Sequence, residues 1–359
     1  MSVEHSQLKP GEERVPSGEA AAIDEIKRLT WEMLDIRNKP VQRGQHAKQH
    51  GCVDAEFIVE PDLPQEFRHG VLKTARTFKA VVRFSNGAKE DDRHADAHGM
   101  AVKLLDIASS GHAAATQDFV MVDHPVFFIR NAADYVIFAS ALRKLQQSLL
   151  ARLLAFSTGA VAVINLAYLF YAFFARGRFH EFKIFLKFVA KRPANPLQHQ
   201  YWSTTPYRLG NNAIRFSARP VVVGTRAPTV EDDHSVQSAD LLRESMASQL
   251  NLANREARFD ILVQLQTDAA AMPVEDPTIA WDEAISPYRK VATLRISPQA
   301  FESPERMQYC ENLVFSPWHT LPEHRPLGGI NRAREVVYAA MSRRRHELNG
   351  VSDRGPAKP

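Results

Sequence analysis

Apolar residues recur along this chain with the two periods that distinguish strands from helices. Short runs that alternate, or that are rich in β-branched and aromatic residues, predict strands at 55–59, 78–85, 99–105, 119–122, 213–223, 259–265 and 291–296. Helical spacing predicts a first helix at 22–37 and a last helix at 331–348, the latter between Gly328-Gly329 and Gly350. Strands and helices in long unequal blocks predict an α+β fold with an antiparallel sheet or barrel.

One apolar segment in the middle of the chain differs from the rest. Residues 153–175 contain no charged side chain, and a helix of that length would span about 34 Å, enough to cross a bilayer core. Residues 176–192 then carry six basic side chains against one acid, interleaved with phenylalanines, as in an interfacial amphipathic helix. A buried helical hairpin, a subunit interface and a membrane-surface contact all account for this pattern.

Composition excludes several classes of protein. A chain of 359 residues with 45% hydrophobic residues can bury a sizeable core, and a formal net charge of only +4 gives no argument for a nucleic-acid partner. Cys52 and Cys310 form no CxxC pair, which argues against a disulfide framework or a zinc site and indicates a reducing cytoplasm. Residues 1–21 are polar and lack a signal-peptide core, so we expect a flexible arm there and a loose tail at 350–359.

The last helix carries the best candidate for chemistry. Arg334 and Tyr338 are four residues apart, so they share one helix face and their side chains can meet. A guanidinium held at a phenolic oxygen favours the phenolate, which is a hard anionic ligand for ferric iron. The same spacing also fits a core tyrosine covered by a surface arginine.

Two segments earlier in the chain, around His46 and at 82–86, carry residues that could act together with the Arg334–Tyr338 pair. His46 lies in a polar segment, and a histidine can take a proton from one peroxide oxygen and return it to the other near neutral pH. Arg83 would find an anionic partner, and Ser85 would orient the histidine by a hydrogen bond. Alternatively, His46 is a structural or exposed histidine and residues 82–86 are an ordinary strand that ends in a turn.

Four segments together resemble catalase signatures, and they occur in catalase order. Any one motif is weakly specific, but four in the correct order are strongly so, and the resemblance spans about residues 38–138 and 310–346. The matching residues are Arg43, His46, Ala47 and Lys48; Arg83-Phe84-Ser85 before Gly99-Met100-Ala101-Val102-Lys103; Asp118, Val120 and Pro125-Val126-Phe127-Phe128-Ile129-Arg130; and Arg334, Tyr338 and Arg345.

The resemblance implies one catalase-like haem domain at 22–349, with an apolar helical insertion at about 145–192. An antiparallel β-barrel would be surrounded by helices, and haem would be buried between barrel and helices. A bilayer-spanning helix in the insertion is the least favoured reading, because it would separate haem-binding segments that must meet in one pocket.

The same resemblance assigns roles to single residues. Tyr338 would be the axial ligand of the iron in haem b (iron protoporphyrin IX), with Arg334 stabilising its phenolate. His46 would be the distal acid–base group, held by Ser85. The remaining implied contacts are Arg43, Arg83 and Arg345 at the haem propionates, which as carboxylates favour guanidinium partners, and Phe127 and Tyr135 on the porphyrin.

One departure from the catalase pattern changes the expected activity. Val122 stands where catalases have the first Asn of G-N-N-T-P, which helps to position peroxide over the iron. An apolar side chain cannot hydrogen-bond peroxide, so efficient dismutation of hydrogen peroxide is put in doubt, while an alkyl chain would suit the site. Asp123 or His124 would replace the missing Asn only if the local backbone shifted.

The chain length and the run at 315–332 are similar to compact bacterial catalase-related proteins, which include organic peroxidases and allene oxide synthase-like enzymes. We therefore expect a haem-dependent peroxidase-type oxidoreductase that acts on hydrogen peroxide or on organic or lipid hydroperoxides, with an organic electron donor. The alternatives are a small true catalase, a hydroperoxide isomerase or dehydratase, and a membrane-associated haem-binding protein without activity. A membrane-surface contact through 153–190, at the periphery of the inner membrane, and a homo-oligomer are compatible with this reading.

Overall fold

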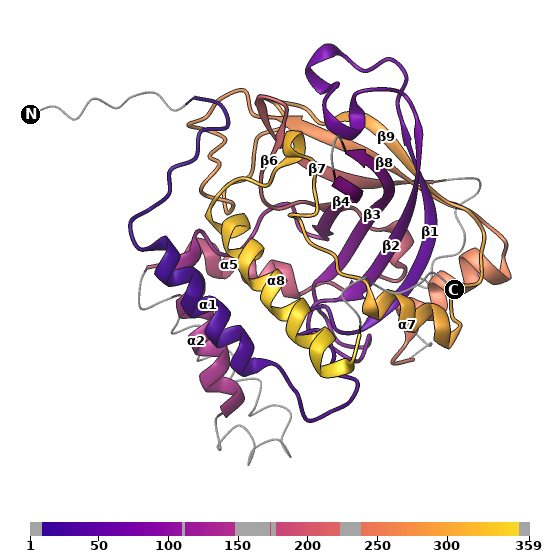
Figure 1. Cartoon of the computed structure of the whole chain (residues 1–359), viewed down its shortest axis with the longest axis horizontal. Coiled ribbons are helices and arrows are strands. Elements are labelled where there is room, and N and C mark those ends of the chain that lie inside the picture. Colours follow the sequence, from indigo (N-terminus) through magenta and orange to yellow (C-terminus); the bar gives the residue numbers. More distant parts are fainter. Residues whose placement is uncertain (1–8, 110–111, 148–172, 174–176, 223–237, 352–359) are drawn as a thin grey trace, which may run out of the picture.

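The computed structural model describes residues 9–109, 112–147, 173, 177–222 and 238–351 (Figure 1). Its centre is an antiparallel barrel of eight strands, closed by the pairing of β5 with β7 in the order β5-β4-β3-β2-β1-β9-β8-β7. A short strand, β6 (Tyr207–Leu209), extends this sheet beside β7. The barrel strands are β1 (Gln49–Val59), β2 (Thr77–Asn86), β3 (His98–Ser109), β4 (His112–Val122), β5 (Tyr201–Trp202), β7 (Asn212–Val221), β8 (Ala257–Leu265) and β9 (Arg289–Ile296).

Side chains fill the inside of this barrel. Phe57 is fully buried and stacks on Phe119 with a centroid distance of 5.5 Å, and Phe119 meets Phe216 edge to face at 5.2 Å. Large side chains of this kind stabilise a core by about 3–5 kcal/mol each relative to alanine. Because the interior is a packed core, a large ligand must bind outside the barrel.

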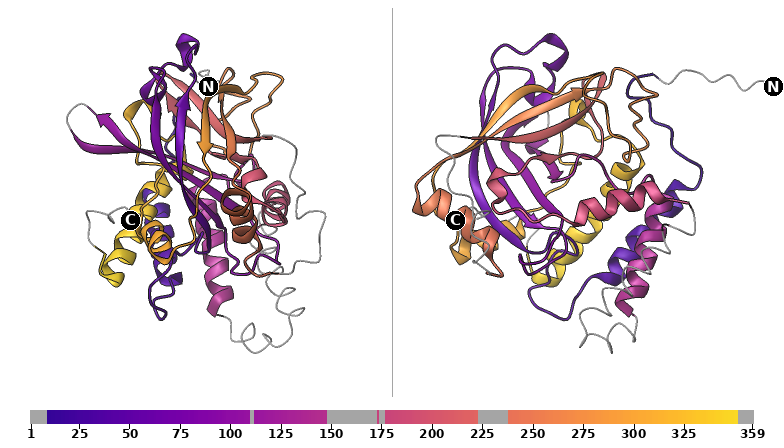
Figure 2. Two further views of the ribbon diagram at one scale, coloured as in Figure 1. Left: turned by 90° about the vertical axis from the view of Figure 1, so that its right-hand side faces the viewer. Right: turned by 180° about the vertical axis from the view of Figure 1, so that it is seen from behind.

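Helices cover the barrel from one side (Figures 1 and 2). α1 (Glu19–Met33) packs against both α2 (Ala132–Gln147) and α8 (Gly329–Asn349), and α5 (Phe179–Val189) lies near α2. α7 (Pro304–Asn312) and α6 (Leu241–Ala247) contact β1. The short helical turns are η1 (Gln65–Phe67), η2 (Gly70–Leu72), η4 (Pro196–Gln198), η6 (Ser248–Leu252) and η7 (Pro322–His324).

The predicted α+β barrel is therefore confirmed, and each of the seven predicted strands falls within a strand or overlaps one. The last helix ends where the sequence indicates, since Gly350 adopts a left-handed conformation with φ 65°. The predicted first helix is misplaced, because α1 begins at Glu19 and ends at Met33. The sequence analysis did not predict α2, α6 or α7.

The apolar stretch 153–175 lies outside the described residues except for Phe173. Of the flanking parts of the expected insertion, residues 145–147 belong to α2 and α5 forms the predicted amphipathic helix. The apolar side of α5 faces inward, where Ile184, Phe185 and Phe188 join a buried cluster with Phe128 and Phe138. No helix within the described ranges is long and apolar enough to cross a membrane.

The described part of the expected N-terminal arm is bound to the body of the protein. The backbone N–H of Gly11 donates to Oε1 of Gln266 at 2.6 Å. Glu13 pairs with Arg332 at 2.7 Å and with Arg325. The described part of the arm therefore makes specific polar contacts with Gln266 after β8, with Arg325 before α8 and with Arg332 in its first turn.

Candidate functional site

The face of α8 that looks toward the barrel carries the Arg334–Tyr338 pair. Nε and Nη2 of Arg334 donate to the phenolic oxygen of Tyr338 at 3.4 and 3.3 Å. Burial lowers the pKa of the Arg334 guanidinium, but the oxygens of Tyr338 and Tyr207 raise it by more, so its pKa is raised overall. A fixed positive charge at this oxygen is what a phenolate ligand requires.

Asn331 holds this arginine in place, and the sequence analysis assigned it no role. Its Oδ1 accepts from Nη1 of Arg334 at 3.1 Å and from the hydroxyl of Thr205, also at 3.1 Å. Its Nδ2 donates to the carbonyls of Pro206 and Leu327. Asn331 is fully buried, so these bonds fix the arginine rigidly. The only signal in the sequence was the three-residue spacing to Arg334.

His46 lies over Gly99, near the start of β3. Its backbone has a φ of 54°, and its N–H donates to the carbonyl of Gly87 at 2.8 Å. Nδ1 of the ring lies 3.1 Å from Oγ of Ser85. The predicted partnership of His46 and Ser85 is therefore present in the geometry.

Gly99 makes this placement of the histidine sterically feasible. A Cβ atom on Gly99 would come within 2.7 Å of Nδ1 of His46, well inside van der Waals contact. Ser85 pairs with Gly99, and Gly99 with Val122, across β2, β3 and β4. Side chains directly opposite one another share a face of the sheet, so Ser85 and Val122 flank the strip over which the imidazole lies.

The surroundings keep the imidazole of His46 neutral. Burial, together with the smaller effect of the positive charge of Arg83, lowers its pKa to about 4. A neutral imidazole at pH 7 can accept a proton, which a general base must do.

Three arginines converge on one carboxylate beside His46. Arg345 lies 3.2 Å, Arg43 3.4 Å and Arg83 3.7 Å from the carboxylate oxygens of Glu311. Burial lowers the pKa of Arg83 to about 9 and that of Arg345 to about 10, and Arg43 adds to both shifts. The cluster has two positive charges in excess, and among the described residues Nε of Arg83 is buried without a hydrogen-bond partner.

This excess of charge fits a ligand with two carboxylates, as the propionates of haem would provide. Arg43, Arg83 and Arg345 come from the segment before β1, from β2 and from α8, so the fold brings the three predicted propionate residues together. Glu311, at the end of α7, had no sequence signal because its position follows only from the packing of α7 on β1.

Two aromatic rings offer a flat surface in the same region. Phe127 and Tyr135 are nearly parallel, with ring centroids 6.5 Å apart and an interplanar angle of 5°. The hydroxyl of Tyr135 accepts from Gln45 at 3.3 Å, close to His46 in the chain. Both rings belong to a hydrophobic cluster that also contains Val122 and Ile330 of α8. Val122, the two aromatic rings and α8 therefore meet in one cluster. Its flat apolar surface would fit a porphyrin ring.

Neither polar neighbour of Val122 takes the place of the missing Asn. Asp123 turns to His98, whose Nδ1 lies 2.8 Å from its carboxylate. His124 bonds the carbonyl of Val126 and packs on Phe188. Of these three residues, only Val122 is paired with Gly99, the residue beneath the imidazole.

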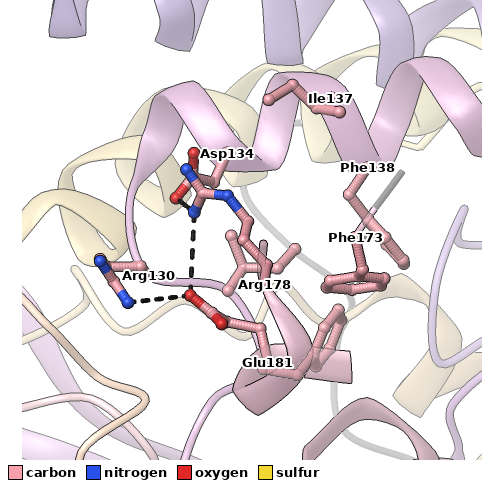
Figure 3. Close-up of a pocket in the computed structure, with 9 residues that line it drawn as sticks. Arg130, Asp134, Ile137, Phe138, Phe173, Arg178 and Glu181 are labelled. Atoms are coloured by element: carbon pink, nitrogen blue, oxygen red, sulfur yellow. Dashed lines mark hydrogen bonds and ion pairs between the residues drawn. The ribbon is translucent and has the colours of Figure 1, made fainter. Parts of the chain in front are cut away.

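A charged cavity lies next to this aromatic cluster (Figure 3). Glu181 of α5 binds Arg130 at 3.0 Å, while Arg178 pairs with Asp134 at the start of α2. The cavity has room for about one water molecule, so it is no substrate site. These pairs attach α5 and its N-terminal flank to residues 130–134 and have a structural role.

Comparisons with known proteins agree with this geometry. Residues 22–157 match the catalase family model. Among solved structures, a fungal catalase is 15% identical with a TM-score of 0.58, covering 98% of this chain and 69% of its own. Catalase A from Saccharomyces cerevisiae is 18% identical with a TM-score of 0.57, covering 98% and 71%, and a bacterial catalase is 16% identical with 0.59, covering 99% and 67%.

The search of curated protein sequences gave no match. At these identities the solved structures show the fold alone, while the family model matches the part of the chain that holds His46, Ser85 and Val122. This chain therefore has the catalase fold, and its residues 22–157 match the catalase family.

Proposed function

We propose that this chain is a haem-dependent oxidoreductase that acts on peroxides as a peroxidase, with Tyr338 as the iron ligand. The observation that carries the proposal is the charged Arg334 held at the oxygen of Tyr338 by a buried Asn331. An ordinary core tyrosine does not need a guanidinium at its oxygen, because burying part of that charge costs free energy unless hydrogen-bond partners compensate for it.

The side chains at the site match the groups of haem b. Tyr338 would hold the iron, Phe127 and Tyr135 would contact the ring, and the three-arginine cluster would bind the propionates. Bound haem would supply the iron that takes up peroxide and the oxidising power of O–O cleavage.

His46 then performs the proton transfer. Its Nδ1 faces Ser85, which leaves Nε2 as the nitrogen that exchanges the proton. Because the lowered pKa keeps the ring neutral, His46 takes the proton of the incoming peroxide and returns it to the departing oxygen. Ser85 and Gly99 keep the ring in one orientation during both transfers.

Val122 favours organic hydroperoxides over hydrogen peroxide as substrates. It donates no hydrogen bond, and it is continuous with the phenylalanine-rich cluster that includes Phe127 and Phe128. An alkyl chain that enters this apolar surface gains roughly 25 cal/mol for each Å² it buries. Lipid hydroperoxides with a small organic electron donor are therefore the substrates we propose.

The test compares substrates on the haem-reconstituted protein with an oxygen electrode. We expect consumption of a fatty-acid hydroperoxide with oxidation of an added phenolic donor, and little oxygen release from hydrogen peroxide. His46→Ala should retain haem and lose about 10²-fold or more of this rate. Vigorous oxygen release would instead indicate a small true catalase, and haem binding without turnover of any peroxide would indicate a haem-binding protein without activity.

A further inference from the structure

The two cysteines of the chain, far apart in sequence, meet in the fold. Cys52 of β1 and Cys310 of α7 are both fully buried and share one small cluster with Val81, Tyr309 and Phe315. Both are free thiols, and the packing of α7 on β1 brings them into the same buried cluster. The absence of a CxxC pair hid this pairing from the sequence analysis.

The two cysteines join β1 and α7 beside the cluster of Arg43, Arg83 and Arg345. Cys52 is opposite Arg83 in the β1–β2 ladder. The carbonyl of Cys310 accepts from Nη2 of Arg43 at 3.1 Å, and the carbonyl of the next residue, Glu311, accepts from the same atom at 3.0 Å. Any bond between the two sulfurs would therefore fix the part of α7 that holds the propionate-binding arginines.

Positive charges surround the pair from several elements. Arg306 of α7 donates from Nε to the carbonyl of Cys52 at 2.8 Å, and its other end binds Asp54 at 2.7 Å. Arg43 donates to the carbonyl of Cys310, and Arg83 is opposite Cys52 in the β1–β2 ladder. Nearby guanidinium groups favour the thiolate, which is the form of cysteine that reacts with peroxide.

We propose that Cys52 and Cys310 form a peroxide-responsive disulfide that ties β1 to α7 and tightens the hold of the protein on haem. The proposal rests on the proposed function in one respect, that peroxide is the oxidant this protein meets. It assigns to the thiols a role outside the turnover of substrate.

The chemistry balances with peroxide alone. One thiolate attacks a peroxide oxygen, the O–O bond breaks, and a sulfenic acid and an alcohol (water, for hydrogen peroxide) form. The second thiol attacks the sulfenic sulfur and releases water, so two thiols and one ROOH give a disulfide, ROH and H₂O. Adjacency makes the second step intramolecular and prevents further oxidation of the sulfenic acid. Burial slows the first step but also shields the finished bond from thiol reductants.

The experiment uses the full-length protein, first without haem. One equivalent of hydrogen peroxide should abolish both titratable thiols, and mass mapping without reduction should find the Cys52–Cys310 peptide pair. The melting temperature should rise by about 5 °C, because the bond closes a long loop. Cys52→Ala and Cys310→Ala should each show neither the crosslink nor the shift.

With haem bound, transfer of haem to excess apomyoglobin should be at least about threefold slower for the oxidised protein than for the reduced one. Diamide, a thiol oxidant that is not a peroxide, provides the control. A crosslink with diamide but none with peroxide, or equal haem-transfer rates in both redox states, would refute the proposal. Because the thiols and the melting temperature are measured without haem, failure of the proposed peroxidase activity leaves these readouts intact.

Discussion

Gly99→Ala tests whether the strand under His46 has to lack a side chain. The new Cβ would lie 2.7 Å from Nδ1 and 2.8 Å from Cε1 of His46, and 3.0 Å from Oγ of Ser85. Unstrained contact needs about 3.5 Å, so the imidazole has to move by roughly 0.8 Å and its bond to Ser85 is lost. A displacement of about 1 Å in a catalytic group costs about 10²-fold in rate, while overpacking costs about 1–3 kcal/mol in stability.

The assay is single-turnover peroxide consumption by stopped flow, normalised to the haem content of each preparation. We expect full haem binding and a rate about 10²-fold below wild type. Gly44→Ala is the matched control, because its Cβ would meet only a methyl group of Leu34 at 3.7 Å. A Gly99→Ala protein that is folded, haem-loaded and as fast as wild type would refute the placement of His46.

Three further predictions concern Val122, the pH dependence of stability through His324, and the buried Lys103–Asp118 ion pair. Val122→Asn restores a hydrogen-bond donor, so oxygen release from hydrogen peroxide, measured with an electrode, should rise by about tenfold or more; an unchanged rate would contradict the role of Val122. Burial lowers the pKa of His324 from 6.5 to about 4, and its Nε2 accepts from the N–H of Val71 at 2.9 Å. The unfolded chain therefore binds a proton at this residue at higher pH than the folded one, and His324 should contribute about 1 kcal/mol per pH unit to the fall in the free energy of unfolding in urea between pH 6.5 and 4. His324→Asn should show a shallower fall, and an equal slope would contradict this assignment. Lys103→Met leaves Asp118 buried without its cation, 2.6 Å away in the wild type, and should cost about 3 kcal/mol in the same assay; addition of Asp118→Leu should recover most of that loss, and no recovery would count against the pair.

Much of the site could be predicted because its residues carry local signals. The i,i+4 spacing brought Arg334 to Tyr338, and the strand that ends at Asn86-Gly87 placed Ser85 beside the turn that holds His46. These contacts depend on regular helix and strand geometry, which periodicity in the sequence reports.

What the sequence did not reveal depends on long-range packing. Glu311 enters the arginine cluster only because α7 packs on β1, and Cys310 meets Cys52 for the same reason. The need for Gly99 follows from strand register and from the left-handed backbone of His46, neither of which has a periodic signature. The start of α1 was misjudged because its N-terminal turn is fixed by Glu19, which pairs with Arg332 far along the chain.

The ligation of haem by Tyr338 is the central claim, and a haem titration of the apo-protein followed by absorption spectroscopy tests it most directly. Wild type and Tyr207→Phe, which removes the other phenol near Arg334, should both give a tight complex with a high-spin tyrosinate-type spectrum. Tyr338→Phe should lose that spectrum and bind haem more weakly. A Tyr338→Phe protein with full haem occupancy and an unchanged spectrum, or a wild type that gives no Soret band, would contradict the account.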